Sequence, residues 1–83
     1  MAKYALITGA ARGIGKSIAL TLAKKQINII INDIEPMKEE AQKTVEEIKQ
    51  AGEDAFFVAA DVSDFDSCTK MIEEIKSKTE KKS

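Results

Sequence analysis

The chain is 83 residues long, with 43% hydrophobic residues, 33% charged residues and a net charge of -1. These values are typical of one globular domain or part of one, and the near-neutral charge argues against nucleic acid or an anionic membrane as a partner. One cysteine and no histidine exclude an internal disulfide and disfavour a transition-metal site. The N-terminal segment resembles neither a signal peptide nor a membrane span, so we expect a cytoplasmic protein.

Apolar runs and helical periodicities alternate along the first half of the chain. Residues Tyr4 to Thr8 form a nearly continuous apolar run before a glycine, which predicts a buried strand. Apolar residues at steps of four then predict an amphipathic helix from about Gly13 to Lys25. The run from Ile27 to Ile31 is rich in β-branched residues and predicts a second strand, which ends at Asn32-Asp33.

The second half repeats this alternation. Pro36 is placed where a first helical turn tolerates proline, and Gly52 is a typical left-handed helix stop, so we expect a second helix between them. Residues Ala55 to Ala60 predict a third strand, and Ser63 with Asp66 resembles a capping box that opens a third helix. The apolar stripes expected on these two helices are Met37, Ala41, Val45 and Ile48, and Phe65, Cys68, Ile72 and Ile75.

This order of elements predicts an α/β fold with a parallel sheet and right-handed crossovers. We expect a Rossmann-type three-layer βαβαβα unit, truncated to half of a doubly wound sheet, with strand order 3-2-1. Residues 1–78 would form an incomplete dinucleotide-binding subdomain and residues 79–83 a charged, frayed tail. The first strand then has only one neighbour, and such an apolar edge favours self-association.

Three of the four glycines lie in one loop, Thr8-Gly9-Ala10-Ala11-Arg12-Gly13-Ile14-Gly15. The loop lies between a predicted strand and a predicted helix, where the first amides of the helix can face a pyrophosphate. Gly9 allows the tight turn, Gly13 lets the backbone approach phosphates, and Gly15 lets helix and sheet pack closely. The alternative is a structural turn that happens to hold three glycines.

Two aspartates follow the second and third predicted strands. Asp33 lies 18 residues (33 minus 15) after Gly15, close to the ~20 expected for the residue that binds the adenosine ribose. A carboxylate there repels a 2′-phosphate and favours NAD, whereas Arg12 in the glycine-rich loop can pair with that phosphate and favours NADP. Asp61-Val62 is placed to contact adenine, through the carboxylate and the next backbone amide. The alternative for both aspartates is an ordinary polar residue at a strand end.

These motifs resemble the short-chain dehydrogenase/reductase family. The segment from Thr8 to Gly15 matches its Thr-Gly-x-x-x-Gly-x-Gly motif, Asp33 matches the acidic residue of its NAD-preferring members, and Asp61-Val62 matches its adenine-contacting pair. The resemblance covers about Ala2 to Lys78. Within the family, the chain is similar to 3-oxoacyl-[acyl-carrier-protein] reductases and to acetoin or polyol dehydrogenases. It implies an NAD(P)-dependent oxidoreductase that moves hydride between nicotinamide and an alcohol/carbonyl pair, and homo-oligomeric full-length relatives.

The resemblance also implies which residues bind the cofactor, and where the chain departs from the family. The implied residues are Gly9, Arg12, Gly13, Ile14 and Gly15 at the pyrophosphate, Asp33 with Ile34 at the ribose, and Asp61 and Val62 at the adenine. Gln26 stands where the family usually has glycine, and the Asn-Asn-Ala-Gly and Ser…Tyr-x-x-x-Lys segments are absent, so no residue receives a catalytic role. The alternatives are a truncated, non-catalytic fragment that at most binds dinucleotide, and a methyltransferase-like adenosyl site, which Thr8 and the glycine spacing disfavour.

Overall fold

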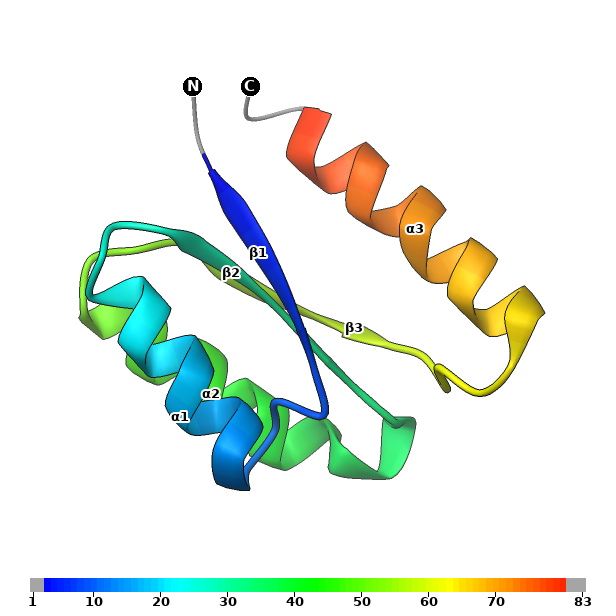
Figure 1. Cartoon of the computed structure of the whole chain (residues 1–83), viewed down its shortest axis with the longest axis horizontal. Helices are drawn as coiled ribbons and strands as arrows, with labels where there is room; N and C mark the ends of the chain where they lie inside the picture. The colour runs from blue at the N-terminus through cyan, green and yellow to red at the C-terminus, as the bar shows by residue number, and fades with distance from the viewer. Residues whose placement is uncertain (1–2, 81–83) are drawn as a thin grey trace.

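The computed structural model describes residues 3–80 of the chain (Figure 1). The elements are β1 (Tyr4–Thr8), α1 (Gly13–Ala23), β2 (Asn28–Asp33), the 3₁₀ turn η1 (Glu35–Met37), α2 (Lys38–Gln50), β3 (Ala55–Ala59) and α3 (Phe65–Glu80). The three strands are parallel, and β2 lies between β1 and β3. The predicted Rossmann-type half-sheet with strand order 3-2-1 is confirmed.

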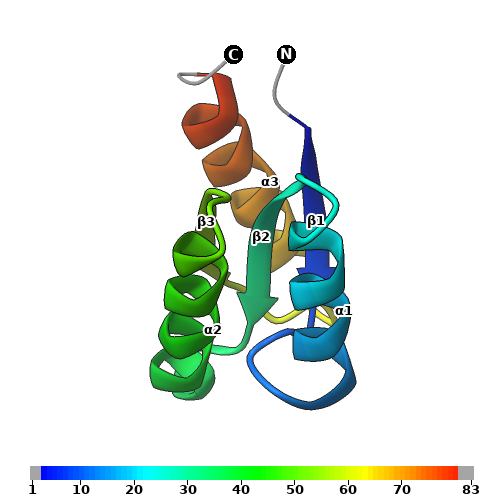
Figure 2. The same cartoon turned by 90° about the vertical axis from the view of Figure 1, so that its left-hand side faces the viewer.

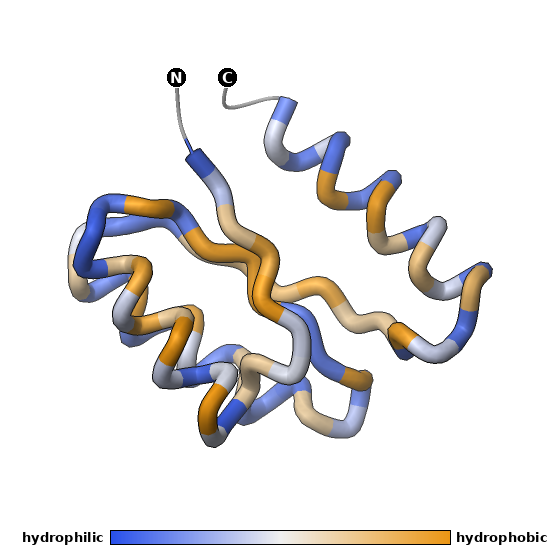
Figure 3. The backbone as a smooth tube through the Cα atoms, in the orientation of Figure 1, coloured by the Kyte–Doolittle hydropathy of each residue, from blue (hydrophilic) through white to orange (hydrophobic). Residues whose placement is uncertain are grey.

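The sheet separates two layers of helices. Helices α1 and α2 cover one face and α3 covers the other (Figures 1 and 2). Side chains alternate along β2, so that Ile29 and Ile31 pack against α1 and α2, whereas Ile30 packs with Val58 and Met71 beneath α3. Each of these isoleucines is at most 3% exposed, and such burial contributes about 1.5–3 kcal/mol per side chain. The apolar strands therefore run through the middle of the molecule (Figure 3), as expected for a parallel strand buried on both faces.

Helix α3 contacts the sheet only in part as predicted, because Ile75 of the predicted stripe packs against the cluster of Ile30, Val58 and Met71. Met71 is its buried residue, at 5% exposure, whereas Phe65 and Ile72 of the predicted stripe are 82% and 44% exposed. The reason is that α3 lies mainly against β3, so the side of the helix that carries Ile72 has no element among residues 3–80 to cover it. The helix continues to Glu80, which makes Thr79 and Glu80 of the predicted tail helical; residues 81–83 lie outside the described part.

The predicted capping role of Ser63 is wrong. Its hydroxyl donates instead to Asp61 Oδ1 at 2.6 Å. The residue before the helix is Asp64, whose Oδ1 accepts the amide of Asp66 at 3.2 Å. Serine and aspartate are about equally good N-caps, so the sequence Ser63-Asp64 offers two caps one residue apart, and the contact with Asp61 engages the first.

The turn after α1 places a non-glycine residue in the left-handed region. Gln26 has φ 66°, and its amide donates to the carbonyl of Ala23 at 3.0 Å. The helix consequently ends at Ala23, two residues before the predicted end. Gln26 thus adopts the backbone conformation that glycine adopts at least cost.

Strand β1 forms one edge of the sheet. It pairs with β2 alone, so its other flank has no strand partner within residues 3–80. Leu6 in this strand is 38% exposed, and Ile14 and Ile18 of the neighbouring helix α1 are 81% and 46% exposed. The predicted apolar edge is therefore present. In the same described range, no helix combines the length and hydrophobicity needed to span a membrane.

Candidate functional site

The carboxyl ends of the three strands meet at one edge of the sheet. In the parallel register Thr8 lies beside Asn32, and Asp33 lies beside Ala59. The segments that carry the predicted site residues leave the sheet at this edge, where ligands of open α/β sheets bind. These residues are Gly9, Arg12, Gly13, Ile14 and Gly15 after β1, Asp33 and Ile34 after β2, and Asp61 and Val62 after β3.

The loop after β1 requires its three glycines for two different structural reasons. Gly9 and Gly13 have φ of 62° and 66°, which favours glycine at both positions. Gly15 is needed for space, because a Cβ there would lie 2.4 Å from the carbonyl oxygen of Gly9 and 2.9 Å from the Cα of Ala10. The helix therefore packs against the turn of its own loop at Gly15, closer to the strand end than any larger residue allows.

The start of α1 leaves its first amides available. Arg12 occupies the N-cap position in an extended conformation, and within residues 3–80 no side chain caps the helix and no acidic residue lies in its first turn. The first helical bond is the one from the amide of Lys16 to the carbonyl of Arg12, at 3.5 Å. The amides of Gly13, Ile14 and Gly15 thus have no partner inside the helix, and the helix dipole adds a partial positive charge there. This arrangement can receive an anion.

The back of the same loop is held by hydrogen bonds from three directions. The amide of Ala10 donates to the carbonyl of Asn32 at 3.1 Å, and the amide of Ala11 donates to Asp33 Oδ2 at 3.2 Å. The hydroxyl of Thr44 on α2 donates to the carbonyl of Ala11 at 3.1 Å. Ala10 and Ala11 are at most 2% exposed, so the loop has a buried, bonded back and an open front.

Asp33 faces this loop with its carboxylate. Oδ2 accepts the amide of Ala11, and Oδ1 accepts the amide of Ile34 at 2.9 Å. The residue is half-buried. An ionised carboxylate has about four acceptor positions, so these two bonds leave acceptor capacity for a ligand at the mouth of the loop.

Asp61 lies beside a pocket between the ends of β2 and β3. The pocket has a volume of about 250 Å³ and is lined by Ile34, Glu35, Ala59, Ala60, Asp61 and Ser67. Oδ1 of Asp61 accepts the hydroxyl and the amide of Ser63, and these two hydrogen bonds hold the pKa of Asp61 below its ordinary value of 3.8. Asp61 is therefore ionised at neutral pH. Val62 is 56% exposed and does not line this pocket.

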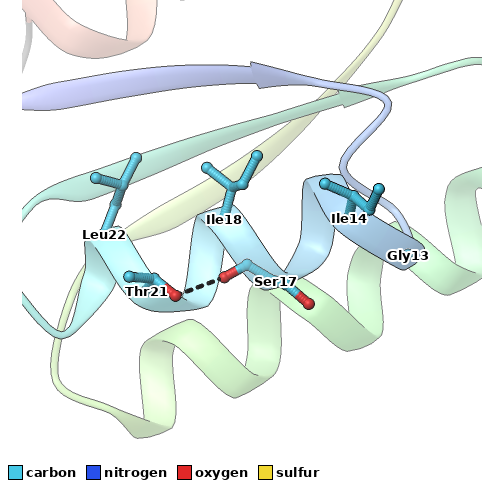
Figure 4. Close-up of a pocket in the computed structure, with 6 residues that line it drawn as sticks. All are labelled: Gly13, Ile14, Ser17, Ile18, Thr21 and Leu22. Atoms are coloured by element: carbon cyan, nitrogen blue, oxygen red, sulfur yellow. Dashed lines mark hydrogen bonds between the residues drawn. The ribbon is translucent and has the colours of Figure 1, made fainter.

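A shallow apolar groove adjoins the open front of the loop. It has a volume of about 520 Å³ and runs along α1, where Ile14, Ile18 and Leu22 project from the same side of the helix (Figure 4). The remaining lining residues are Gly13, Ser17 and Thr21. No lining residue is charged, so the groove offers an uncharged surface next to the uncapped start of α1.

Two residues at the site were not predicted from the sequence. The side chain of Asn32 is buried and donates from Nδ2 to the carbonyls of Val58 and Ala60, at 3.1 and 3.4 Å, which ties the end of β2 to the end of β3. Thr44 is fully buried although it is polar. A polar residue within an apolar helical stripe is the only sequence signal for Thr44, and it does not reveal the partner.

Comparison with known proteins follows the same residues. The profile of the short chain dehydrogenase family matches residues 3–81. The 3-oxoacyl-[acyl-carrier-protein] reductase FabG of Staphylococcus aureus (strain N315) is 49% identical over 75 residues, which are 90% of this chain and 30% of the relative. Versicolorin reductase stcU of Emericella nidulans is 43% identical over 87% of this chain and 27% of the relative.

A third relative, trihydroxynaphthalene reductase of Colletotrichum orbiculare, is 42% identical over 92% of this chain and 27% of the relative. The chain thus spans less than a third of the length of the curated relatives that it matches. The family profile nevertheless covers nearly the whole chain, and the parallel half-sheet and the glycine-rich loop are those that the sequence motifs predicted. The chain belongs to the short-chain dehydrogenase family.

Proposed function

We propose that this chain is the dinucleotide-binding part of an NAD(P)-dependent oxidoreductase. When bound, the cofactor supplies hydride transfer between its nicotinamide and an alcohol/carbonyl pair. The three reductases that resemble this chain support an activity of this class. The chain's own residues bind and orient the dinucleotide, as residues 1–78 of an incomplete subdomain.

The proposed binding residues follow the shape of the site. The amides of Gly13, Ile14 and Gly15 donate to the diphosphate, with Gly9 shaping the turn and Arg12 beside it. Asp33 accepts from the ribose hydroxyls, and Ile34 borders the pocket next to it. Asp61 accepts from the adenine amino group through the oxygen that Ser63 does not use, and the amide of Val62 donates to a ring nitrogen.

One observation carries this proposal. An uncapped helix start, a half-buried carboxylate and a pocket with a second carboxylate lie at the same edge of a parallel sheet. A dinucleotide presents an anion, a diol and a flat polar base in the same order. A loop whose glycines served only a tight turn would need neither the open amides nor Asp33 at its back.

We propose NAD as the preferred cofactor. The carboxylate of Asp33 is held at the loop by two backbone amides, so it stays close to any phosphate on the 2′-position and repels it. Arg12 acts in the opposite direction, but it is exposed, and its side chain makes no capping contact. The Arg12 side chain would lose conformational entropy on pairing with a 2′-phosphate. The Asp33 carboxylate is already fixed, so its repulsion of that phosphate outweighs the attraction by Arg12.

The second candidate is a non-catalytic fragment that only binds dinucleotide. The lack of a Ser…Tyr-x-x-x-Lys segment in the 83 residues favours it for the chain as it stands. The second flank of β1, which has no strand partner within residues 3–80, also favours self-association of such a chain, because unpaired backbone groups along an apolar strand can pair with a second copy. Full-length relatives would form homo-oligomers.

Titration calorimetry with NAD and NADP tests both binding and preference. We expect the folded chain to bind NAD more tightly than NADP. Asp33→Asn keeps an acceptor oxygen but removes the charge, so it should weaken NAD binding roughly tenfold, since hydrogen bonds to charged groups contribute about 1.5–3 kcal/mol. The same change should bring the two dissociation constants closer together.

Asp54→Asn is the matched control, because Asp54 directly precedes β3 and therefore lies at the amino ends of the strands, away from the site at their carboxyl ends. It changes the net charge equally and should leave both dissociation constants unchanged. Absence of heat with either cofactor, on a sample whose circular dichroism shows a folded chain, would contradict the proposed function. An unchanged preference in Asp33→Asn would place the discrimination elsewhere.

A further inference from the structure

Thr44 carries a buried hydroxyl that reaches from α2 to the glycine-rich loop. The residue is fully buried, and its Oγ1 lies 3.1 Å from the carbonyl oxygen of Ala11 and 3.4 Å from that of Glu40 in its own helix. The shorter contact joins residues 33 positions apart in the chain. A helical threonine can satisfy its hydroxyl within its own helix. The contact with Ala11, which lies outside that helix, is therefore a feature specific to this position.

The bond to Ala11 fixes the direction of the next amide. The carbonyl of Ala11 and the N–H of Arg12 belong to one peptide unit, which is planar and trans, so the two groups point in opposite directions. With the carbonyl directed at α2, the N–H of Arg12 is directed away from α2. This amide precedes those of Gly13 and Ile14 at the open helix start.

We propose that Thr44 is a positioning residue for phosphate binding, which rests on the proposed dinucleotide function. By holding the carbonyl of Ala11 toward α2, it holds the amide of Arg12 toward the incoming diphosphate. Helix α2 therefore contributes to affinity through a residue that is buried beneath the loop and does not touch the ligand.

Removal of the hydroxyl leaves the carbonyl of Ala11 without its partner in a buried place. Ala11 is only 2% exposed, and an unpaired buried carbonyl is costly. The peptide unit then gains by rotating its carbonyl toward water at the open front, and the same rotation turns the N–H of Arg12 away from the ligand. The damage is thus specific to a ligand that accepts hydrogen bonds at this place.

The test uses the 83-residue chain, with NAD as the probe. Thr44→Val keeps the shape but removes the donor, and we expect its dissociation constant for NAD to rise about three- to tenfold, the range for one hydrogen bond. Thr44→Ser returns the donor and should restore the dissociation constant to within about twofold. Thr69→Val is the control, because the hydroxyl of Thr69 donates to the carbonyl of Phe65 within its own helix α3.

A second readout follows the amide of Arg12 directly. In the wild-type chain its ¹H–¹⁵N resonance should shift strongly when NAD is added, and in Thr44→Val this shift should be small. If Thr44→Val is unfolded at the assay temperature, all variants are titrated in trimethylamine oxide, which favours compact states. The same comparison then applies.

The outcomes separate this proposal from the function on which it rests. A folded wild-type chain that does not bind NAD contradicts the function itself. A wild-type chain that binds, with Thr44→Val binding equally well, overturns the role of Thr44 alone. Equal weakening in Thr44→Ser and Thr44→Val also overturns it, because the hydroxyl would then not be the active feature.

Discussion

A carboxylate introduced at Ile14 should separate the stability of the chain from its affinity for a dinucleotide. Ile14 is the second residue of α1 and is 81% exposed, so its replacement removes little buried apolar surface. An acid in the first helical turn stabilises a helix by about 0.3–1 kcal/mol. We therefore expect Ile14→Asp to fold at least as stably as the wild type.

The same carboxylate would oppose a bound diphosphate. At about 6 Å and an effective dielectric constant of about 40–80, two unit charges repel each other by about 0.7–1.4 kcal/mol. Two phosphate charges give roughly 1.4–2.8 kcal/mol, which corresponds to about ten- to hundredfold weaker binding. Salt screens part of this repulsion, since the Debye length falls from about 30 Å at 0.01 M to about 8 Å at 0.15 M ionic strength.

The assay combines urea denaturation with calorimetric titration of NAD at low and at physiological ionic strength. Ile14→Asn is the matched control, because it has nearly the same shape and no charge. We expect the Ile14→Asp variant to bind NAD more weakly than the Ile14→Asn variant at both salt concentrations, with a smaller difference at the higher one. If both variants are folded and have equal dissociation constants for NAD, the placement of the diphosphate at the start of α1 is refuted.

Two further predictions concern stability. Gln26→Gly should raise the free energy of unfolding by roughly 0.5–1 kcal/mol in urea denaturation, because it relieves the left-handed backbone at φ 66°. Part of that gain is lost, since glycine has more conformational entropy in the unfolded chain. An unchanged denaturation midpoint would mean that Gln26 is not strained. Asp61 has a lowered pKa in the folded state, so its contribution to stability is present above its ordinary pKa of 3.8 and is lost as the pH falls through the lower folded value. Ser63→Ala removes the hydroxyl that is the largest cause of this shift, and an NMR titration of the Asp61 carboxyl carbon should then give a pKa closer to 3.8; the same midpoint in both proteins would contradict this cause.

Local patterns predicted the order of the elements and the position of the site. Each of the three strands is a short apolar run, and each is followed by a polar or glycine-containing segment, so its type and its end were readable. Parallel pairing then placed Asp33 next to the loop after β1, because all three strands end at the same edge. These features depend on neighbours in sequence and on one topological rule.

Features that depend on how side chains are arranged in the folded chain could not be predicted. The capping choice between Ser63 and Asp64 depends on where the carboxylate of Asp61 lies. Met71 joins Ile75 of the predicted stripe on the packed side of α3, because the helix lies over β3. The partner of Thr44 is 33 residues away in the sequence, and the helical and strand periodicities do not predict contacts at that separation.

The bonded back of the glycine-rich loop has a thermodynamic consequence for ligand capture. Ala10 and Ala11 are already immobilised by β2 and α2 in the free chain, so a ligand need not bear the entropic cost of ordering them. Association should then resemble rigid docking, with little slow rearrangement after encounter. Mutations that loosen this anchoring would act mainly by adding an ordering step to complex formation.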